Sequence, residues 1–163
     1  MERCEECGFE YDMTAALSAA SSIVGDVAEF AALLGDRDAD LRSRREPATW
    51  SPLEYGCHVR DLLLVQRERV LAARRTDRPA CSPMGRDERA DHDGYADQQP
   101  ADVARQLVDA AQLFGNVLNR LSTDDWDRRL MYPERAERSL QWVAVHTLHE
   151  VSHHLLDARR QLG

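Results

Sequence analysis

Apolar residues recur at helical spacing in four long segments of this chain. The segments cover residues 14–34, 52–73, 100–121 and 140–161, and charged or proline-containing stretches separate them. The clearest start signal is Ser51-Pro52-Leu53-Glu54, in which Ser at the N-cap and Glu three residues later form a capping box and Pro takes the first helical position. Because no segment alternates convincingly as a strand does, the sequence predicts an all-α four-helix bundle.

At 163 residues, the chain is long enough for one domain with one substantial core. We expect the bundle to span residues 14–163, and residues 1–13 to form an N-terminal CxxC segment outside it. Residues 75–99 lack helical spacing and predict a loop that either covers a substrate or extends into solvent. Residues 122–138 form a second connector, and Ser139 is the expected cap of the last helix.

Trp50 and Tyr55 lie at the two positions of a hydrophobic staple around the Ser51 cap. The periodic segments also predict which side chains face the core. In the first segment the apolar positions are Leu17, Ile23, Val24, Val27, Phe30 and Leu33. In the last segment they are Leu148, Val151, Leu155 and Leu162.

The formal net charge of −8 argues against a nucleic-acid partner, which would require a basic surface. Arginine supplies every basic residue, so mechanisms that need a Schiff-base or phosphate-loop lysine are excluded. We find no run of about 18 apolar residues for a membrane span and no apolar secretory segment near the N-terminus. We therefore expect a cytoplasmic protein without a membrane partner, whose four cysteines bind metal or react as thiols rather than form disulfides.

Four of the six histidines fall within nine residues of the last helical segment. His146, Glu150 and His154 follow one another at steps of four residues, and His149 and His153 form a second pair with the same spacing. Residues four apart on a helix lie about 5–6 Å from each other at the side-chain base, so each pair can hold one metal ion. The cluster therefore contains two separate metal-binding pairs on neighbouring strips of the helix.

A catalytic metal needs a third ligand from elsewhere in the chain. His58 lies on the rigid second helix, whereas His92 lies in the expected loop. A site made of His58, Glu150 and His154 would leave coordination positions open for water and substrate.

Cys4 and Cys7 form a C-x-x-C-G motif, which supplies half of a tetrahedral zinc site. With His149 and His153 it would make a second, structural zinc site that fastens the N-terminal segment to the last helix. The alternative is a disordered tail with free or redox-active cysteines. Residues that could replace members of this set are Cys57, Cys81, His92 and His146.

Several of these motifs, in this order, resemble the DinB superfamily. They are Trp50 to Glu54 followed by Cys57-His58, then Trp126-Asp127, and finally His149-Glu150-x-x-His153-His154-x-x-Asp157. The resemblance covers residues 14–162 and implies a four-helix fold with a bound divalent metal. It assigns His58 as the ligand of the second helix and a pair from the last helix, either Glu150 with His154 or, in a competing register, His149 with His153.

That superfamily includes maleylpyruvate isomerases and S-transferases that use mycothiol or bacillithiol. The resemblance thus implies an enzyme that activates a low-molecular-weight thiol at a zinc or nickel ion, in a cleft at one end of the bundle, and transfers it to a small-molecule substrate. A hydrolase that uses metal-bound water and a non-catalytic stress protein that binds metal or ligand are the alternatives. His146 and Asp157 are candidates for outer hydrogen-bond partners of the ligands, and a helix face could form a homodimer.

Overall fold

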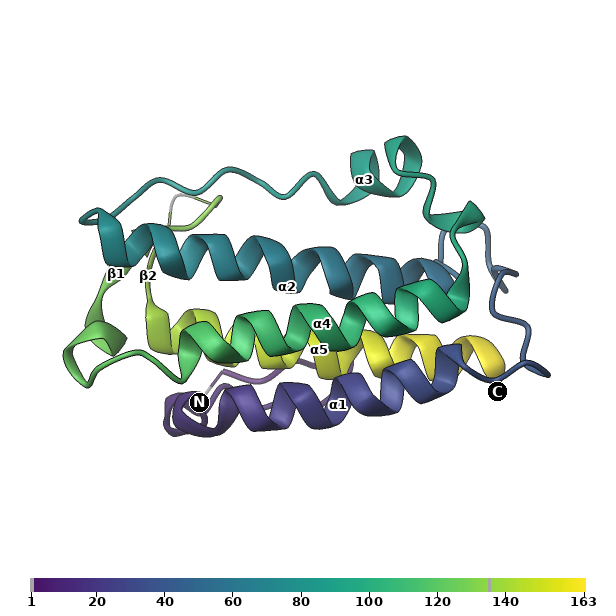
Figure 1. Ribbon diagram of the computed structural model, residues 1–163, viewed down its shortest axis with the longest axis horizontal. Coiled ribbons are helices and arrows are strands. Elements are labelled where there is room, and N and C mark those ends of the chain that lie inside the picture. Colours follow the sequence, from purple (N-terminus) through teal and green to yellow (C-terminus); the bar gives the residue numbers. More distant parts are fainter. Residues whose placement is uncertain (1, 135) are drawn as a thin grey trace.

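Four long helices form the body of the protein, in a computed structural model that describes residues 2–134 and 136–163 (Figure 1). They are α1 (Ala19–Leu34), α2 (Pro52–Arg75), α4 (Pro100–Leu118) and α5 (Leu140–Leu162). The short elements are the 3-10 helices η1 (Met13–Ser18), η2 (Tyr95–Asp97) and η3 (Asp124–Asp127), the helix α3 (Arg86–His92) and the strands β1 (Arg129–Met131) and β2 (Glu137–Ser139). The expected four-helix bundle is confirmed.

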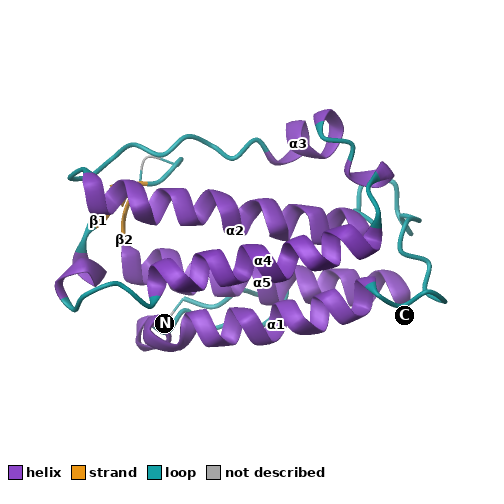
Figure 2. Ribbon diagram, in the orientation of Figure 1, coloured by secondary structure: helices purple, strands orange, loops and turns teal. Residues whose placement is uncertain are grey.

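The two strands were not predicted, and they form a small antiparallel ribbon inside the second connector (Figure 2). Each strand has three residues, which is too short for an alternating pattern to stand out in the sequence. Met131 of β1 also exchanges backbone hydrogen bonds with residues 79 and 81, with its N–H 2.9 Å from the carbonyl of Pro79 and its carbonyl 2.9 Å from the N–H of Cys81. The ribbon therefore ties the end of the α2 connection to the connector before α5.

The order of the helices around the bundle explains the long segment between α2 and α4. α4 packs against α1 and α2, and α5 packs against α2 and α1, so α1 and α2 face each other across the bundle with few contacts. Because α2 and α4 run in the same direction, the chain must return along the length of α2, about 36 Å for its 24 residues, before α4 begins (Figure 1). Residues 76–99 make this return and contain α3 and η2.

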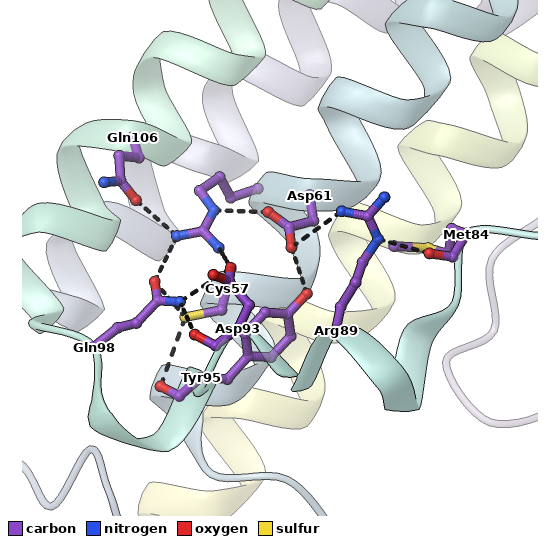
Figure 3. Close-up of polar contacts among 9 residues, drawn as sticks. Cys57, Asp61, Met84, Arg89, Asp93, Tyr95, Gln98 and Gln106 are labelled. Carbon is purple, nitrogen blue, oxygen red and sulfur yellow. Dashed lines mark hydrogen bonds and ion pairs between the residues drawn. The ribbon is translucent and has the colours of Figure 1, made fainter. Parts of the chain in front are cut away.

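A buried polar network holds the returning segment against α2 (Figure 3). The Tyr95 side chain is fully buried, and its hydroxyl donates a hydrogen bond of 2.6 Å to Asp61 of α2. Arg60 contacts the other oxygen of the same carboxylate at 2.9 Å and donates to Gln98 at 2.7 Å. The segment is therefore anchored at its η2 end rather than being an excursion into solvent.

The start of α2 forms as the capping box predicts. The Ser51 hydroxyl accepts from the Glu54 N–H at 3.3 Å, and the Glu54 carboxylate accepts from the Ser51 N–H at 2.9 Å. Arg44 adds two hydrogen bonds of 2.8 and 2.5 Å to the same carboxylate. The Trp50 and Tyr55 rings are in contact, with centroids 5.7 Å apart, which confirms the predicted staple. These contacts fix the helix turn that carries His58.

Most predicted core positions are buried, but three are exposed and Leu33 is half-buried. Ile23, Val27 and Phe30 are buried in α1, and Leu148, Val151 and Leu155 are buried in α5. Leu17, Val24 and Leu162 are exposed, and the side chain of Leu17 is 77% accessible. Leu17 lies in the 3-10 helix η1, where the 3.6-residue register of α1 does not apply. Leu162 is the last residue of α5 and extends beyond its helical neighbours.

One helical stretch, Met13–Leu34, is long and apolar enough to cross a membrane, in contrast to the expectation from sequence. Only the length and the composition of this stretch support a membrane span, and the core helix of a soluble protein meets the same two criteria. Ile23, Val27 and Phe30 of this stretch pack in the centre of the bundle.

Replacing Ser51 with alanine is expected to lower the free energy of unfolding by about 1 kcal/mol, because the Glu54 N–H loses its acceptor. Urea denaturation followed by circular dichroism measures the change. Ser21→Ala, on the exposed surface of α1, is the matched control and should change stability by less than about 0.5 kcal/mol. Equal effects of the two substitutions would contradict the capping role.

The Glu54 carboxylate should stabilise the fold only at pH values where it is ionised. Burial raises its pKa, but the hydrogen bonds from Arg44 and the Ser51 N–H outweigh burial and leave the pKa below the ordinary value. A lowered pKa in the folded state gives stability above the unfolded-state pKa that is lost as the pH falls through the folded-state value. We expect Glu54→Gln to cost about 1.5 kcal/mol at pH 7, and urea denaturation at successively lower pH should show this difference shrinking. A difference independent of pH would contradict the ion pair.

Candidate metal centre

His58 lies on the second turn of α2 and is almost fully buried, with 2% of the residue exposed. Burial lowers the pKa of its imidazole to about 3, so the ring is neutral at physiological pH. The Nδ1 atom has no hydrogen-bond partner. A neutral, buried imidazole with an unpaired nitrogen is suited to bind a metal ion, because a buried polar atom without a partner is otherwise costly.

Glu150 and His154 extend from α5 toward His58. The His58 and His154 rings meet edge to face with centroids 4.9 Å apart, and the Glu150 Oε2 atom lies 3.6 Å from the His154 Nε2 atom. One ligand atom from each of the three residues lies within 4.8 Å of the other two. The packing of α5 on α2 therefore brings together the three ligands predicted from the sequence.

Asp157 lies one turn beyond His154 and orients its ring. The His154 Nδ1 atom is 3.2 Å from Asp157 Oδ2, an arrangement in which Nδ1–H donates to the carboxylate and Nε2 is free to bind metal. Burial opposes the charged form of His154, but the hydrogen bonds to Asp157 and Glu150 dominate and raise its pKa. The same Asp157 oxygen lies 3.3 Å from His153 Nε2, so one carboxylate contacts two neighbouring histidines.

A cleft of about 360 Å³ opens over these three residues. Its walls come from α2 and α5, from the returning segment at residues 83–86, and from the connector at residues 132–134. Arg69 and Arg86 place positive charge on the walls. The cleft lies along the side of the bundle between α2 and α5 rather than at one end, since its lining extends from His58 to Arg69 of α2 and from His146 to His154 of α5.

His146 lines the same cleft and is half-buried. Its ring stacks on Trp142 with centroids 4.3 Å apart, and its Nδ1 atom lies 3.0 Å from the Tyr11 hydroxyl. Burial lowers the pKa of His146, so the neutral form is favoured. Tyr11 belongs to the N-terminal segment, and nothing in its sequence context indicated that it would reach α5.

The N-terminal cysteines meet the other histidine pair. One ligand atom from each of Cys4, Cys7, His149 and His153 lies within 4.8 Å of the others. Backbone N–H groups of Cys7 and Glu6 stabilise the thiolate of Cys4 and help lower its pKa to about 6. Among the described residues, His58 groups with Glu150 and His154 and not with this pair, so the geometry favours the first of the two registers.

The remaining candidates lie apart from both clusters. Cys57 is buried in α2, and burial raises the pKa of its thiol to about 12, which makes it unreactive at neutral pH. Cys81 lies half-buried in the returning segment. His92 is exposed at the end of α3. None of the metal-binding groups found among the described residues includes these three.

The fold and the sequence agree with one known family. The sequence model of the DinB superfamily matches residues 25–158. The chain belongs to the DinB superfamily. The match includes α2 and all three residues of the candidate site in the cleft, whereas Cys4 and Cys7 lie outside it.

A solved structure has the same fold at low sequence identity. YfiT from Bacillus subtilis, described as a probable metal-dependent hydrolase with an unusual four-helix bundle topology, superposes with a TM-score of 0.73 and 13% identity. The alignment covers 98% of this chain and 93% of YfiT. No curated protein sequence shows significant similarity to the chain. At this identity the likeness establishes the fold alone.

Replacing Asp157 with asparagine is expected to weaken metal binding by roughly 10- to 100-fold, because the substitution removes the carboxylate that orients the ligand ring. Competition with a chromogenic chelator measures the affinity. Asp109→Asn, at an exposed position of α4, is the matched control and should leave affinity unchanged. Unchanged affinity in Asp157→Asn would show that this carboxylate has no orienting role.

Proposed function

We propose that this protein binds one divalent metal ion, zinc or nickel, through His58, Glu150 and His154 and uses it as a thiol S-transferase. The observation that carries the proposal is the convergence of three ligand atoms from α2 and α5 in the wall of a cleft. The buried Nδ1 atom of His58 supports it, because this atom has no hydrogen-bond partner and a metal ion bound there would supply one.

The donor set fits such an ion. Two imidazoles and a carboxylate are typical ligands of a catalytic zinc, which keeps a fourth position open. At metal–ligand distances near 2.0–2.2 Å, tetrahedral ligand atoms are about 3.3–3.6 Å apart. Ligand atoms that already lie within 4.8 Å of one another therefore need only a small contraction.

A divalent metal at an open three-ligand site lowers the pKa of a bound thiol or water toward neutrality. The chain supplies the rest of the environment. Burial keeps His58 neutral, and Asp157 holds the His154 ring in one orientation. The returning segment forms one wall of the cleft and excludes bulk water from that side.

Two features of the cleft favour a thiol brought in by a cosubstrate. Among the described residues that line the cleft, none carries a thiol or an aliphatic hydroxyl group, so a thiol nucleophile at this site would have to come from a cosubstrate. Arg69 and Arg86 can bind the carboxylates of a low-molecular-weight thiol or of the acceptor. Arg69 is held in place by its hydrogen bonds to the Tyr132 hydroxyl at 3.0 Å and the Ser82 carbonyl at 2.8 Å.

A metal-dependent hydrolase is the second candidate. The likeness to YfiT supports it, because that protein is described as a probable hydrolase of this kind. The open position that would take a thiol could equally take water. The two activities differ in one requirement, since only the transferase needs a thiol.

The proposed transferase should accelerate the reaction of monobromobimane or another electrophile with a low-molecular-weight thiol such as mycothiol or bacillithiol above its uncatalysed rate, and only when metal is bound. His58→Ala should lower this rate at least about 100-fold, because the metal contributes several kcal/mol to the stabilisation of developing charge. His92→Ala, an exposed histidine outside the cleft, is the control and should retain the wild-type rate.

Different outcomes separate the candidates. Metal-dependent ester or amide cleavage without thiol would favour the hydrolase and overturn the transferase. A fully loaded protein with neither activity would support a role in binding alone. Unchanged metal content in His58→Ala would contradict the ligand assignment itself.

A further inference from the structure

The N-terminal segment is an ordered hairpin that presents both of its cysteines to α5. Arg3 and Glu10 pair as an antiparallel bridge, and the Cys4 N–H donates to the Phe9 carbonyl at 2.9 Å. Gly8, with φ of +76°, lets the chain turn directly after Cys7, and its N–H donates to the Cys4 carbonyl at 2.9 Å. The backbone contacts within the hairpin therefore fix the positions of both cysteines.

The matching side chains on α5 are His149 and His153, one turn apart. The His153 Nδ1 atom lies 3.8 Å from the Cys4 Sγ atom. His149 is 8% exposed, and its Nε2 atom is buried without a hydrogen-bond partner. A buried imidazole nitrogen without a partner, in a group that contains two thiols, points to a ligand that the chain itself does not provide.

The opposite nitrogen of each ring already has an acceptor. His149 Nδ1 lies 2.8 Å from the Tyr11 hydroxyl and 3.3 Å from Glu150 Oε1. His153 Nε2 lies 3.3 Å from Asp157 Oδ2 and 3.4 Å from Glu6 Oε2. Such contacts place the proton on the outer nitrogen and leave the inner nitrogen free, as is usual for histidines that bind metal.

We propose that Cys4, Cys7, His149 and His153 bind a second metal ion, a structural zinc that fastens the N-terminal hairpin to α5. Two thiolates and two imidazoles complete a tetrahedral zinc site with no open position, so this ion holds structure rather than substrate. Tetrahedral ligand atoms at zinc–sulfur and zinc–nitrogen bond lengths are about 3.3–3.8 Å apart. The four ligand atoms lie within 4.8 Å of one another, so binding requires a closure of at most about 1.5 Å.

The ligands of this site are distinct from those of the proposed function, although Asp157 contacts one histidine of each set. The site shares no residue with His58, Glu150 and His154, and it lies on the side of α5 that faces the hairpin. Two further groups of possible ligands among the described residues, one with His146 and one with Asp157, each include a residue from both sites, but the two sites have no residue in common. Both ions can therefore be bound at once, and each site can be emptied without removing a ligand of the other.

Metal content of the full-length protein, purified under reducing conditions from zinc-supplemented cells, tests the proposal. The double variant Cys4→Ser, Cys7→Ser should contain one zinc equivalent less per chain than the wild type. Cys81→Ser, a half-buried cysteine outside both groups, is the matched control and should keep the wild-type content. Equal zinc content in the double variant and the wild type would overturn the proposal.

Cobalt substitution separates the two sites by their ligands. Tetrahedral cobalt bound by thiolates has an intense sulfur-to-metal absorption, which the wild type and His58→Ala should show and the double variant should lack. Loss of this absorption in His58→Ala, with its retention in the double variant, would overturn the assignment. A failure of the proposed function alone would leave the thiolate absorption intact.

A measurement on the wild type tests the zinc site even if the double variant fails to fold. Titration with an organomercurial reagent, which reacts with thiols, should release one zinc equivalent to a colorimetric chelator as Cys4 and Cys7 are modified. A protein whose cysteines form a disulfide, or react without release of metal, would contradict the zinc site.

Discussion

The burial of imidazole and carboxylate groups along α5 is the constraint on which the site depends. A buried polar atom without a partner costs roughly 1–3 kcal/mol, and α5 packs between α2 and the N-terminal hairpin with four histidines and a glutamate in the contact. Most of these groups are paired with one another, with Tyr11 or with Asp157. The side-chain nitrogens that stay buried and unpaired in the described residues include His58 Nδ1 and His149 Nε2, one in each ligand cluster. Two bound ions would account for both clusters.

The topology places the cleft where α2 meets α5. Parallel α2 and α4 require a chain that returns along the bundle (Figure 1). Residues 83–86 of this return line the same cleft as His58. The contact of Tyr95 with Asp61 anchors one end of the returning segment (Figure 3). Its backbone pairing with Met131 of β1 anchors the other end. The order of the helices thus explains why residues 83–86 form one wall of the cleft. These residues are not part of a helix dictated by apolar spacing, so the sequence pattern does not predict their position.

Local signals explain what the sequence could predict. The Ser51 cap and the apolar spacing act within a few residues, so the four helices follow from the sequence, and a helical wheel divides the α5 histidines into the two pairs that the structure separates. Contacts between distant segments are not encoded in such patterns. Tyr11 reaches His146 and His149 across more than 130 residues of chain, and the order of helices around the bundle depends on packing of all four. The exposed Leu17 shows a further limit, since the period of a 3-10 turn differs from that of the helix that follows it.

Charge distinguishes the roles of the two proposed ions. With two thiolates, zinc at Cys4, Cys7, His149 and His153 would be electrically neutral, which suits a buried ion that holds structure. With one carboxylate, a divalent ion at His58, Glu150 and His154 would keep a net positive charge of one and remain able to attract an anionic ligand. The protein as a whole carries a formal charge of −8 and would repel such a ligand at long range. The residual charge of the ion, together with Arg69 and Arg86, would outweigh the negative charge of Glu134 and reverse that potential within the cleft, where the carboxylates of a thiol cosubstrate would have to bind.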